Sequence, residues 1–276
     1  MNHLEGRVAL ISGASSGIGK QAARAFARRG CRLLLAARRL EHLHELADDL
    51  AGRHPEIQAL PLRMDLADFA SIDSAVARGL EAMGRIDILV NNAGVGEFDW
   101  LEALDPQSGI ANPIAVNLTG AIFLTRAVLP GMMAQRGGHV VFVASLAGLV
   151  ATPTYSIYAA TKSGLLAFAD SLRREVGIWG IKVSTLLPGP VGTGFASESV
   201  ARRRTGLTTP AGWILSQERV GEAVARLAEH PRRQWIIPWW IRPLVWIARA
   251  WPWMVDRAVE TVFVRRERGG NGSGGP

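Results

Sequence analysis

The chain has 276 residues, of which 48% are hydrophobic and 20% are charged; this composition suits a globular protein with a substantial core and excludes wholesale disorder. Lys and Arg outnumber Asp and Glu by 31 to 24, which favours an acidic partner such as a phosphorylated cofactor or an anionic membrane, unless the arginines simply cover solvated faces. Cys31 is the one cysteine, so an internal disulfide is excluded and a reducing compartment is expected.

Short apolar runs alternate with helix-length amphipathic segments through most of the chain. Six runs are predicted strands, at residues 8–11, 32–36, 58–62, 88–91, 139–144 and 182–187. Continuous apolar runs are typical of strands buried on both faces, and the intervening lengths suit right-handed crossovers. The pattern predicts an α/β fold: a doubly wound parallel sheet (Rossmann fold) with helices on both faces.

The domain organisation follows from changes in composition along the chain. No apolar segment of signal-peptide length precedes the first strand, so we expect a cytoplasmic protein. Residues 1–230 are predicted to form one catalytic domain, residues 231–268 an aromatic and basic helical extension, and the Gly-rich residues 269–276 a flexible tail. Within the domain, residues 193–216 lose periodicity, which indicates either a mobile substrate lid or an exposed basic helix.

The first predicted strand leads directly into a glycine-rich loop, followed by an Ala-rich helix predicted at residues 20–29. Glycines let a backbone turn tightly and approach a pyrophosphate, whose charge the amides and dipole of a helix N-terminus stabilise. The spacing G-x-x-x-G-x-G departs from the common G-x-G-x-x-G, and a turn without a ligand is the alternative. The residues predicted to bind a dinucleotide here are Gly13, Ser15, Ser16, Gly17, Ile18 and Gly19.

The second predicted strand ends next to Arg38 and Arg39. An NAD site commonly offers a carboxylate at this point, but the next acidic residue is Glu41. A guanidinium can instead pair with the 2′-phosphate of NADP. NADP(H) is therefore the favoured cofactor and NAD(H) the alternative, unless both arginines only face solvent.

Three side chains form a candidate catalytic group. Tyr158 and Lys162 are four apart in a predicted helix, so they share a face, and an ammonium beside the phenol favours its phenolate. Ser145 follows the apolar run 140–144, at the strand end where open α/β sheets bind ligands, and its hydroxyl can donate to a substrate oxygen. Tyr155 has Ala159 four residues on and cannot form the same pair, so we interpret it as pocket lining or packing.

The glycine loop and the order of Ser145, Tyr158 and Lys162 resemble the short-chain dehydrogenase/reductase family, over about residues 6–229. The resemblance implies an NAD(P)-dependent oxidoreductase in which Asn117 is a fourth catalytic residue that holds a water relay, and Lys162 also binds the nicotinamide ribose. It implies further cofactor contacts from Asp65, Leu66, Asn92, Ala93, Gly94, Pro188, Gly189, Val191 and Thr193, and no metal.

Six tryptophans gather between Trp235 and Trp253, among aliphatic residues and arginines. Charges at Arg242, Arg249 and Asp256 keep any apolar run here shorter than the roughly 20 residues of a membrane-spanning helix. Trp mixed with Arg is typical of a membrane interface, so one hypothesis is peripheral membrane contact. The other is a terminal helix that closes the substrate pocket or covers an oligomer interface.

The sequence thus predicts an NADP(H)-dependent enzyme that interconverts a carbonyl and a secondary alcohol, on a hydrophobic small molecule such as one of lipid metabolism, as a homo-oligomer. The alternatives are an NAD(P)-dependent 3-oxoacyl reductase or small-alcohol dehydrogenase, and a non-catalytic dinucleotide-binding scaffold. Nucleic acid is not an expected partner, because the basic residues are dispersed and no reading motif is present.

Overall fold

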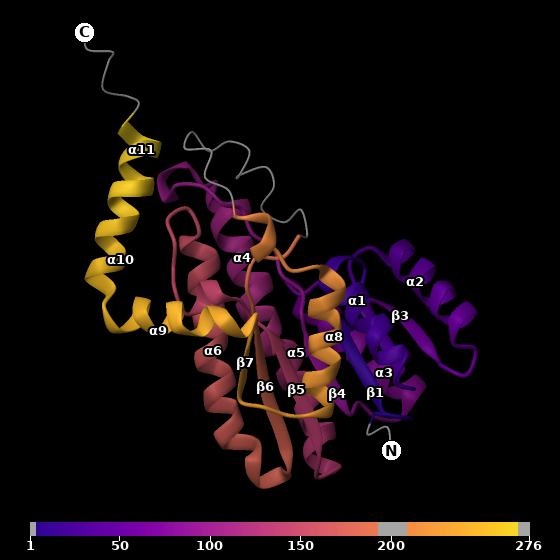
Figure 1. Ribbon diagram of the computed structural model, residues 1–276. Coiled ribbons are helices and arrows are strands. Elements are labelled where there is room, and N and C mark those ends of the chain that lie inside the picture. The colour runs from indigo at the N-terminus through magenta and orange to yellow at the C-terminus, as the bar shows by residue number, and fades with distance from the viewer. Residues whose placement is uncertain (1–3, 193–208, 270–276) are drawn as a thin grey trace.

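The computed structural model describes residues 4–192 and 209–269. Its centre is a parallel sheet of seven strands in the order β3-β2-β1-β4-β5-β6-β7 (Figure 1). The strands are β1 Val8–Ser12, β2 Arg32–Ala37, β3 Ala59–Arg63, β4 Ile88–Asn91, β5 Gly138–Val143, β6 Ile181–Pro188 and β7 Gln234–Ile237. The six predicted strands are confirmed to within one residue at each end. The seventh was not predicted, and it carries the sheet into the segment assigned to the extension.

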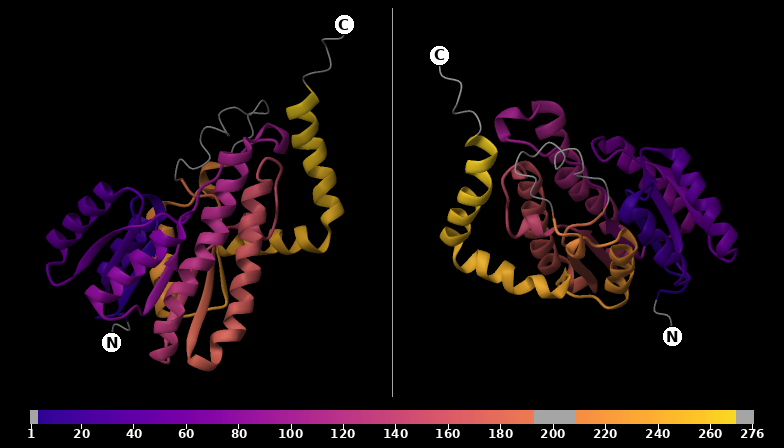
Figure 2. Two further views of the ribbon diagram at one scale, coloured as in Figure 1. Left: turned by 180° about the vertical axis from the view of Figure 1, so that it is seen from behind. Right: turned by 45° about the horizontal axis from the view of Figure 1, so that its top comes forward.

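Helices cover both faces of the sheet, as predicted (Figures 1 and 2). One face is covered by α1 Gly17–Ala27, α2 Leu40–Arg53 and α8 Gln217–Glu229, and the other by α3 Phe69–Met83, α5 Ala121–Ala134 and α6 Ser156–Val176. Alternation along β1 divides its side chains, because Ala9 and Ile11 enter the first core and Val8 and Leu10 the second. A strand buried on both faces reads as a continuous apolar run, which is why the sequence pattern was clear.

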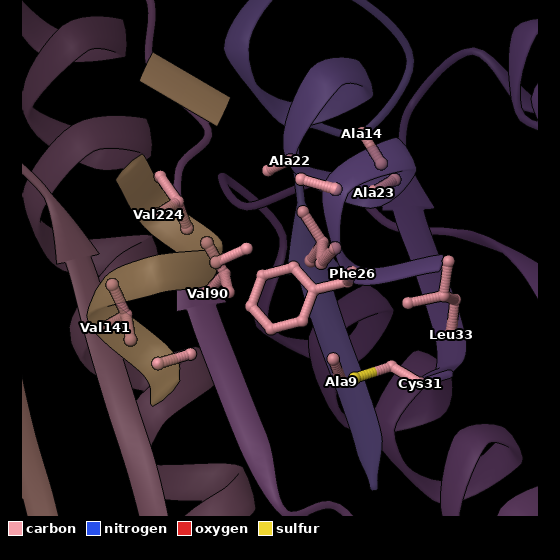
Figure 3. Close-up of a cluster of buried hydrophobic side chains, with 14 of the residues drawn as sticks. Ala9, Ala14, Ala22, Ala23, Phe26, Cys31, Leu33, Val90, Val141 and Val224 are labelled. Atoms are coloured by element: carbon pink, nitrogen blue, oxygen red, sulfur yellow. The ribbon is translucent and has the colours of Figure 1, made fainter. Parts of the chain in front are cut away.

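The first core is centred on Phe26 of α1, which is fully buried. Figure 3 shows its ring between the strand residues Ala9 and Val90 and the α8 residue Val224. Burying a side chain of this size contributes about 1.5–3 kcal/mol. This packing fixes α1, and with it the glycine-rich loop at the N-terminus of α1, against the sheet.

Shorter helical turns connect these elements. They are η1 Leu101–Ala103, η2 Pro106–Ala111, α4 Asn112–Ile114, η3 Ala115–Gly120, η4 Leu146–Gly148, η5 Gly177–Trp179 and η6 Ala211–Trp213. The segment Pro106–Ala134 is helical throughout, and by length and composition alone it could cross a membrane. That is weak evidence, because the core helix of a soluble protein passes the same test, and Val116, Leu124 and Val128 of this segment pack into the second core.

After β7 the chain forms η7 Trp239–Ile241, α9 Arg242–Ala250, α10 Pro252–Val259, η8 Glu260–Val264 and α11 Arg265–Arg268. Residues 242–268, which we name the C-terminal arm, make an L-shaped extension at the side of the domain (Figures 1 and 2). The predicted helical extension is therefore present. None of the described residues of the arm is buried, and Trp246 and Trp253 are 64% and 65% exposed.

A buried histidine makes the stability of this fold depend on pH. His139 of β5 is 6% exposed, and its Nε2 lies 2.8 Å from Ser184 Oγ of β6. Burial lowers the pKa of the imidazole from 6.5 to about 4. The unfolded chain therefore takes up this proton near pH 6.5 and the folded protein only near pH 4, so the free energy of unfolding falls as the pH drops through that window, by about 3 kcal/mol.

We expect His139→Gln to remove this slope, measured as urea unfolding free energies at pH 7, 5.5 and 4.5. Protonation of Asp87 also lowers the free energy of unfolding, but only at lower pH. Burial alone would raise the pKa of its carboxyl, but hydrogen bonds from Val8 N–H and Arg85 outweigh that effect and hold the pKa below 3.8. The difference between wild type and variant thus isolates the imidazole. Equal slopes in the two proteins would contradict the assignment.

Candidate active site

A cavity of about 1230 Å³ lies at the carboxyl ends of the strands. Its walls include Gly13 after β1, Arg38 after β2, Asn92 after β4 and Ser145 after β5. The strand order reverses direction between β1 and β4, and open α/β sheets bind ligands at such a switch point. Pockets for drug-sized ligands measure about 300–1,000 Å³, so this cavity has room for a dinucleotide and a small substrate together.

Most of the residues predicted from the sequence line this one cavity. They are Gly13, Ser15, Ser16, Gly17, Ile18, Arg38, Arg39, Asp65, Leu66, Asn92, Ala93, Gly94, Ser145, Tyr158, Lys162, Pro188, Gly189 and Val191. Gly19 and Asn117 lie behind the lining. Thr193 and most of the predicted lid, residues 193–208, lie outside the described residues.

The glycine-rich loop fits a pyrophosphate. Ser16 is extended and its side chain makes no capping hydrogen bond, so it leaves amides of the first turn of α1 available to an anion. A Cβ on Gly19 would lie 2.2 Å from the carbonyl oxygen of Gly13, so only glycine allows this tight turn. Gly17 has a φ of +58° and nothing within 4 Å of its Cβ direction, which leaves space for a ligand.

The loop is tied to the end of β4 by polar contacts. Asn92 Nδ2 donates to the carbonyl oxygen of Ser12 at 3.0 Å, and Ser12 Oγ accepts from the backbone N–H groups of Asn92 and Ala93 at 3.0 and 3.2 Å. Ser12 Oγ in turn donates to the carbonyl oxygen of Val90 at 3.2 Å. These bonds hold the ends of two neighbouring strands in one fixed arrangement at the cavity wall.

Arg38 and Arg39 stand at the same wall, where β2 ends. Arg39 Nη2 donates to Ser16 Oγ at 3.2 Å and Ser15 Oγ at 3.4 Å, so a guanidinium lies directly over the glycine-rich loop. Both arginines are exposed to the cavity. Among the described lining residues the one carboxylate is Asp65, and its Oδ1 accepts from the N–H of Ala67 at 3.0 Å. The charge balance at this end of the cavity is therefore positive.

The candidate catalytic side chains converge at the other end. Ser145 and Tyr158 hydrogen-bond to each other through their side chains. Lys162 is 3% exposed; its Nζ donates to the carbonyl oxygen of Val143 at 3.1 Å and lies 5.6 Å from the centre of the Tyr158 ring. The helical spacing of α6 and the end of β5 thus bring together the phenol, ammonium and hydroxyl expected from the sequence.

Burial shifts both titratable groups toward their neutral forms. It raises the pKa of Tyr158 to about 12, although the hydrogen bond with Ser145 acts in the opposite direction. Burial also lowers the pKa of Lys162 to about 8. The sequence argument considered only the ammonium and expected it to favour the phenolate; here desolvation is the larger effect. At neutral pH the phenol keeps its proton and can donate it.

Asn117 acts on the backbone beside this group. It lies in the π-helical turn η3, and its Oδ1 accepts from Val95 N–H at 2.7 Å while its Nδ2 donates to the Val95 carbonyl oxygen at 2.8 Å. A Cβ on Gly94 would lie 3.4 Å from Asn117 Oδ1 and 3.6 Å from Lys162 Nζ, so both polar groups approach this glycine. Such widened helical turns are frequent at functional sites.

The sequence analysis missed part of the cavity wall. Tyr155, interpreted as lining or packing, is a lining residue, and its ring lies 4.3 Å from that of Phe98. Phe98 is 6% exposed, and its ring is 5.5 Å from that of Tyr158. The position of Phe98, shortly after the end of β4, was the signal in the sequence that could have identified it as a lining residue. Thr209 and Ile214, in the described part of the predicted lid, also line the cavity. The other lining residues not predicted are Ala36, Ala37, Met64, Val95, Gly96, Val116, Val143, Ala144, Pro190, Gly192 and Gln217.

The tryptophan-rich segment contributes none of the described lining residues. The interpretation of this segment as a helix that closes the pocket therefore finds no support in the part of the chain that the structure describes. The segment contacts the lining from outside: the Ile237 carbonyl oxygen accepts from the N–H of the lining residue Gly189 at 2.8 Å, and the ring of Trp240 lies 4.8 Å from that of Trp213, beside the lining residue Ile214.

Comparisons with known proteins agree with this geometry. The family model described as "short chain dehydrogenase" matches residues 7–204. The chain is 43% identical over 196 residues to "Dehydrogenase/reductase SDR family protein 7-like" of Anopheles gambiae, covering 69% of this chain and 61% of that protein. It is 41% identical over 205 residues to "Oxidoreductase UcpA" of Escherichia coli K12, covering 74% and 76%. The match thus spans about three fifths of the insect protein.

Solved structures show the same fold. A short-chain dehydrogenase/reductase from Burkholderia phymatum in complex with NAD superposes with a TM-score of 0.79, at 26% identity, over 92% of this chain and 97% of that one. An alcohol dehydrogenase from Thermococcus sibiricus complexed with 5-hydroxy-NADP gives 0.75, at 28% identity, over 84% and 96%. With its fold, its glycine-rich loop and its family match, this chain belongs to the short-chain dehydrogenase/reductase family, a family of NAD(P)-dependent oxidoreductases that act on CH–OH groups.

Proposed function

We propose that the protein interconverts a carbonyl compound and a secondary alcohol with NADP(H). The observation that carries this proposal is the hydrogen-bonded pair of Ser145 and Tyr158, beside the buried Lys162, in the same cavity as the glycine-rich loop. A bound nicotinamide dinucleotide would supply or accept the hydride. The alternative of a non-catalytic scaffold gives no reason for a phenol and a hydroxyl to be paired there.

The chain's own residues would handle the substrate oxygen and its proton. Ser145 Oγ would hold the carbonyl oxygen by a hydrogen bond as negative charge develops on it. Tyr158 would donate the phenolic proton to the same oxygen, and in alcohol oxidation it would accept that proton back. Because burial keeps Tyr158 protonated near neutral pH, carbonyl reduction is the direction that this site favours.

The preference for NADP(H) over NAD(H) rests on Arg38 and Arg39. Both residues line the cavity where the second strand ends, and the guanidinium of Arg39 donates to Ser15 and Ser16. Guanidinium groups pair well with a phosphate through charge-assisted hydrogen bonds. The two solved relatives carry NAD in one case and an NADP derivative in the other, so the fold alone supports neither choice.

We propose a lipophilic substrate, because apolar side chains surround Tyr158. Phe98, Tyr155, Val95 and Ile214 line the cavity, whereas a small polar substrate would need more donors and acceptors. Purified protein should be assayed for NADPH and NADH oxidation with matched hydrophobic and polar ketones and aldehydes, including a 3-oxoacyl thioester. Faster turnover of the polar or thioester compounds would favour the small-substrate alternative; cofactor binding without turnover of any carbonyl would favour the scaffold.

We also propose that the C-terminal arm lies on an anionic lipid surface. Its exposed side chains include Trp246, Trp253, Leu244 and Met254, a combination that suits the headgroup region of a bilayer. The arm contains six arginines (Arg242, Arg249, Arg257, Arg265, Arg266 and Arg268) and three acids (Asp256, Glu260 and Glu267). Each basic residue near an anionic surface contributes about 1 kcal/mol, which favours lipid over a second copy of the same basic arm.

Vesicle flotation tests this proposal. We expect the protein to float with vesicles that contain about 30% anionic lipid, and the double variant Trp246→Ser/Trp253→Ser to bind at least about fivefold more weakly. Ile178→Ser is the matched control, since Ile178 is 79% exposed on the domain and outside the arm. If the wild type stays in solution, and the double variant converts a dimer to a monomer by light scattering, the arm covers a second copy instead.

A further inference from the structure

The far end of the C-terminal arm contacts the domain at residues 96–104. These residues lie between β4 and the continuous helical segment Pro106–Ala134. Arg268 Nη2 lies 2.7 Å from Glu102 Oε1, and its guanidinium carbon is 3.9 Å from the centre of the Trp100 ring. The ring of Phe263 lies 6.3 Å from the same indole. Figures 1 and 2 show α11 next to this part of the chain, far from α9 where the arm begins.

The same segment reaches the candidate catalytic group two residues earlier. Phe98 is buried between Tyr155 and Tyr158 and lines the cavity. The link from Phe98 to Trp100 is short and ordered, because Asp99 Oδ1 accepts from Trp100 N–H at 2.8 Å and the Trp100 carbonyl oxygen accepts from Ala103 N–H at 2.9 Å. The indole and the phenyl ring are therefore carried two residues apart on one locally hydrogen-bonded stretch of backbone.

Other contacts fix the two ends of the segment, and its middle is bonded locally, by Ser108 Oγ donating to Glu97 Oε2 at 3.1 Å and by Ala103 N–H donating to the Trp100 carbonyl oxygen at 2.9 Å. At one end Asn117 holds the backbone of Val95, and at the other Asp105 accepts from Gln107 and Ser108 N–H at the start of the helical segment Pro106–Ala134. Between them, side-chain contacts hold the chain: Phe98 on the inside and Arg268 on the outside. An exposed ion pair and a cation–π contact are both weak, too weak to alter folding but strong enough to change a local population several-fold.

We propose that Arg268 is a positioning residue for the substrate site: by holding Trp100 and Glu102 it keeps Phe98 packed on Tyr155 and Tyr158, and so sets the wall against which the substrate lies. The inference rests on the proposed function for its effect on turnover. A consequence of this inference is that the position of the arm affects substrate affinity. Any ligand that moves the arm would therefore affect substrate affinity as well.

Arg268→Ala tests this contact, with Arg265→Ala as the matched control because, among the described residues, Arg265 pairs with Glu260 of the arm itself, at 2.7 Å. We expect Arg268→Ala to raise the KM for the carbonyl substrate about 3- to 10-fold, with kcat and the KM for NADPH within about twofold of wild type. Arg268→Lys keeps the cation and should recover part of the loss. Arg265→Ala should behave as wild type.

A second readout does not need turnover. Amide hydrogen exchange of residues 96–104 should be faster in Arg268→Ala than in Arg265→Ala, while urea midpoints of both variants match the wild type. Unchanged exchange together with an unchanged KM would overturn the inference while leaving the proposed function intact. A wild type that turns over no carbonyl would instead reject the proposed function, and the exchange comparison would still decide whether Arg268 orders this segment.

Discussion

Replacing Tyr158 by Phe is expected to lower kcat by about 10²–10⁴-fold and to leave the Kd for NADPH within about twofold of wild type. The substitution removes the oxygen that hydrogen-bonds with Ser145 and would transfer the proton, but it keeps the ring that packs edge-on against Phe98. Stopped-flow or steady-state NADPH oxidation with the best carbonyl substrate measures the rate, and fluorescence titration measures cofactor binding.

Tyr155→Phe is the matched control, because it removes the chain's other phenolic oxygen from the same cavity and also preserves an aromatic ring. Its rate should stay within about threefold of wild type, since the proposal gives the Tyr155 oxygen no proton to transfer. A Tyr158→Phe protein that retains near-normal turnover would remove the assignment of Tyr158 as proton donor. Loss of NADPH binding along with turnover would show instead that the substitution had disturbed the cofactor site.

The double variant Arg38→Ala/Arg39→Ala is expected to weaken NADPH binding by about 10- to 100-fold while changing NADH binding by less than about threefold. A hydrogen bond to a charged group contributes about 1.5–3 kcal/mol. Arg38 and Arg39 both line the cavity at the proposed 2′-phosphate position, and the guanidinium of Arg39 lies beside Ser15 and Ser16. Calorimetric titration with each cofactor measures both affinities under the same buffer and salt conditions.

Arg63→Ala provides the control for a general loss of positive charge. Arg63 ends β3, next to β2, and it is exposed but not part of the described cavity lining. Its removal should lower affinity for both cofactors equally and only slightly. If the double variant binds NADPH as well as wild type does, or loses NADH to the same degree, the preference for NADP(H) has no basis in Arg38 and Arg39.

The parts of the protein that the sequence revealed depend on local or periodic signals. Strands β1, β2 and β5 are nearly continuous apolar runs, which are typical of a parallel sheet buried on both faces. The glycine-rich loop was recognisable because its backbone geometry excludes side chains at fixed positions, as at Gly19. The spacing of Tyr158 and Lys162 is a property of one helix and needed no distant partner.

Strand β7 carries no such local signal and was not predicted. Gln234–Ile237 starts with a polar residue directly after two arginines and runs into Pro238 and the tryptophan cluster, so no bounded apolar run marks it as a strand. It becomes a strand by pairing with β6, from Thr185 with Gln234 to Pro188 with Ile237. Phe98 was missed for a related reason, because an irregular segment carries it to the cavity and no periodic pattern indicates the direction of its side chain.

Composition and order along the chain were thus enough to determine the fold class, the dinucleotide loop, the family and a set of candidate site residues, because each depends on neighbours within about one turn or one strand. Tertiary structure alone decided how burial acts on the pKa values of Tyr158 and Lys162, since desolvation of both groups depends on what packs around them. It also decided the place of the tryptophan-rich segment: an exposed arm whose Arg268 contacts Trp100, 168 positions away in the chain, through a proximity that only folding creates.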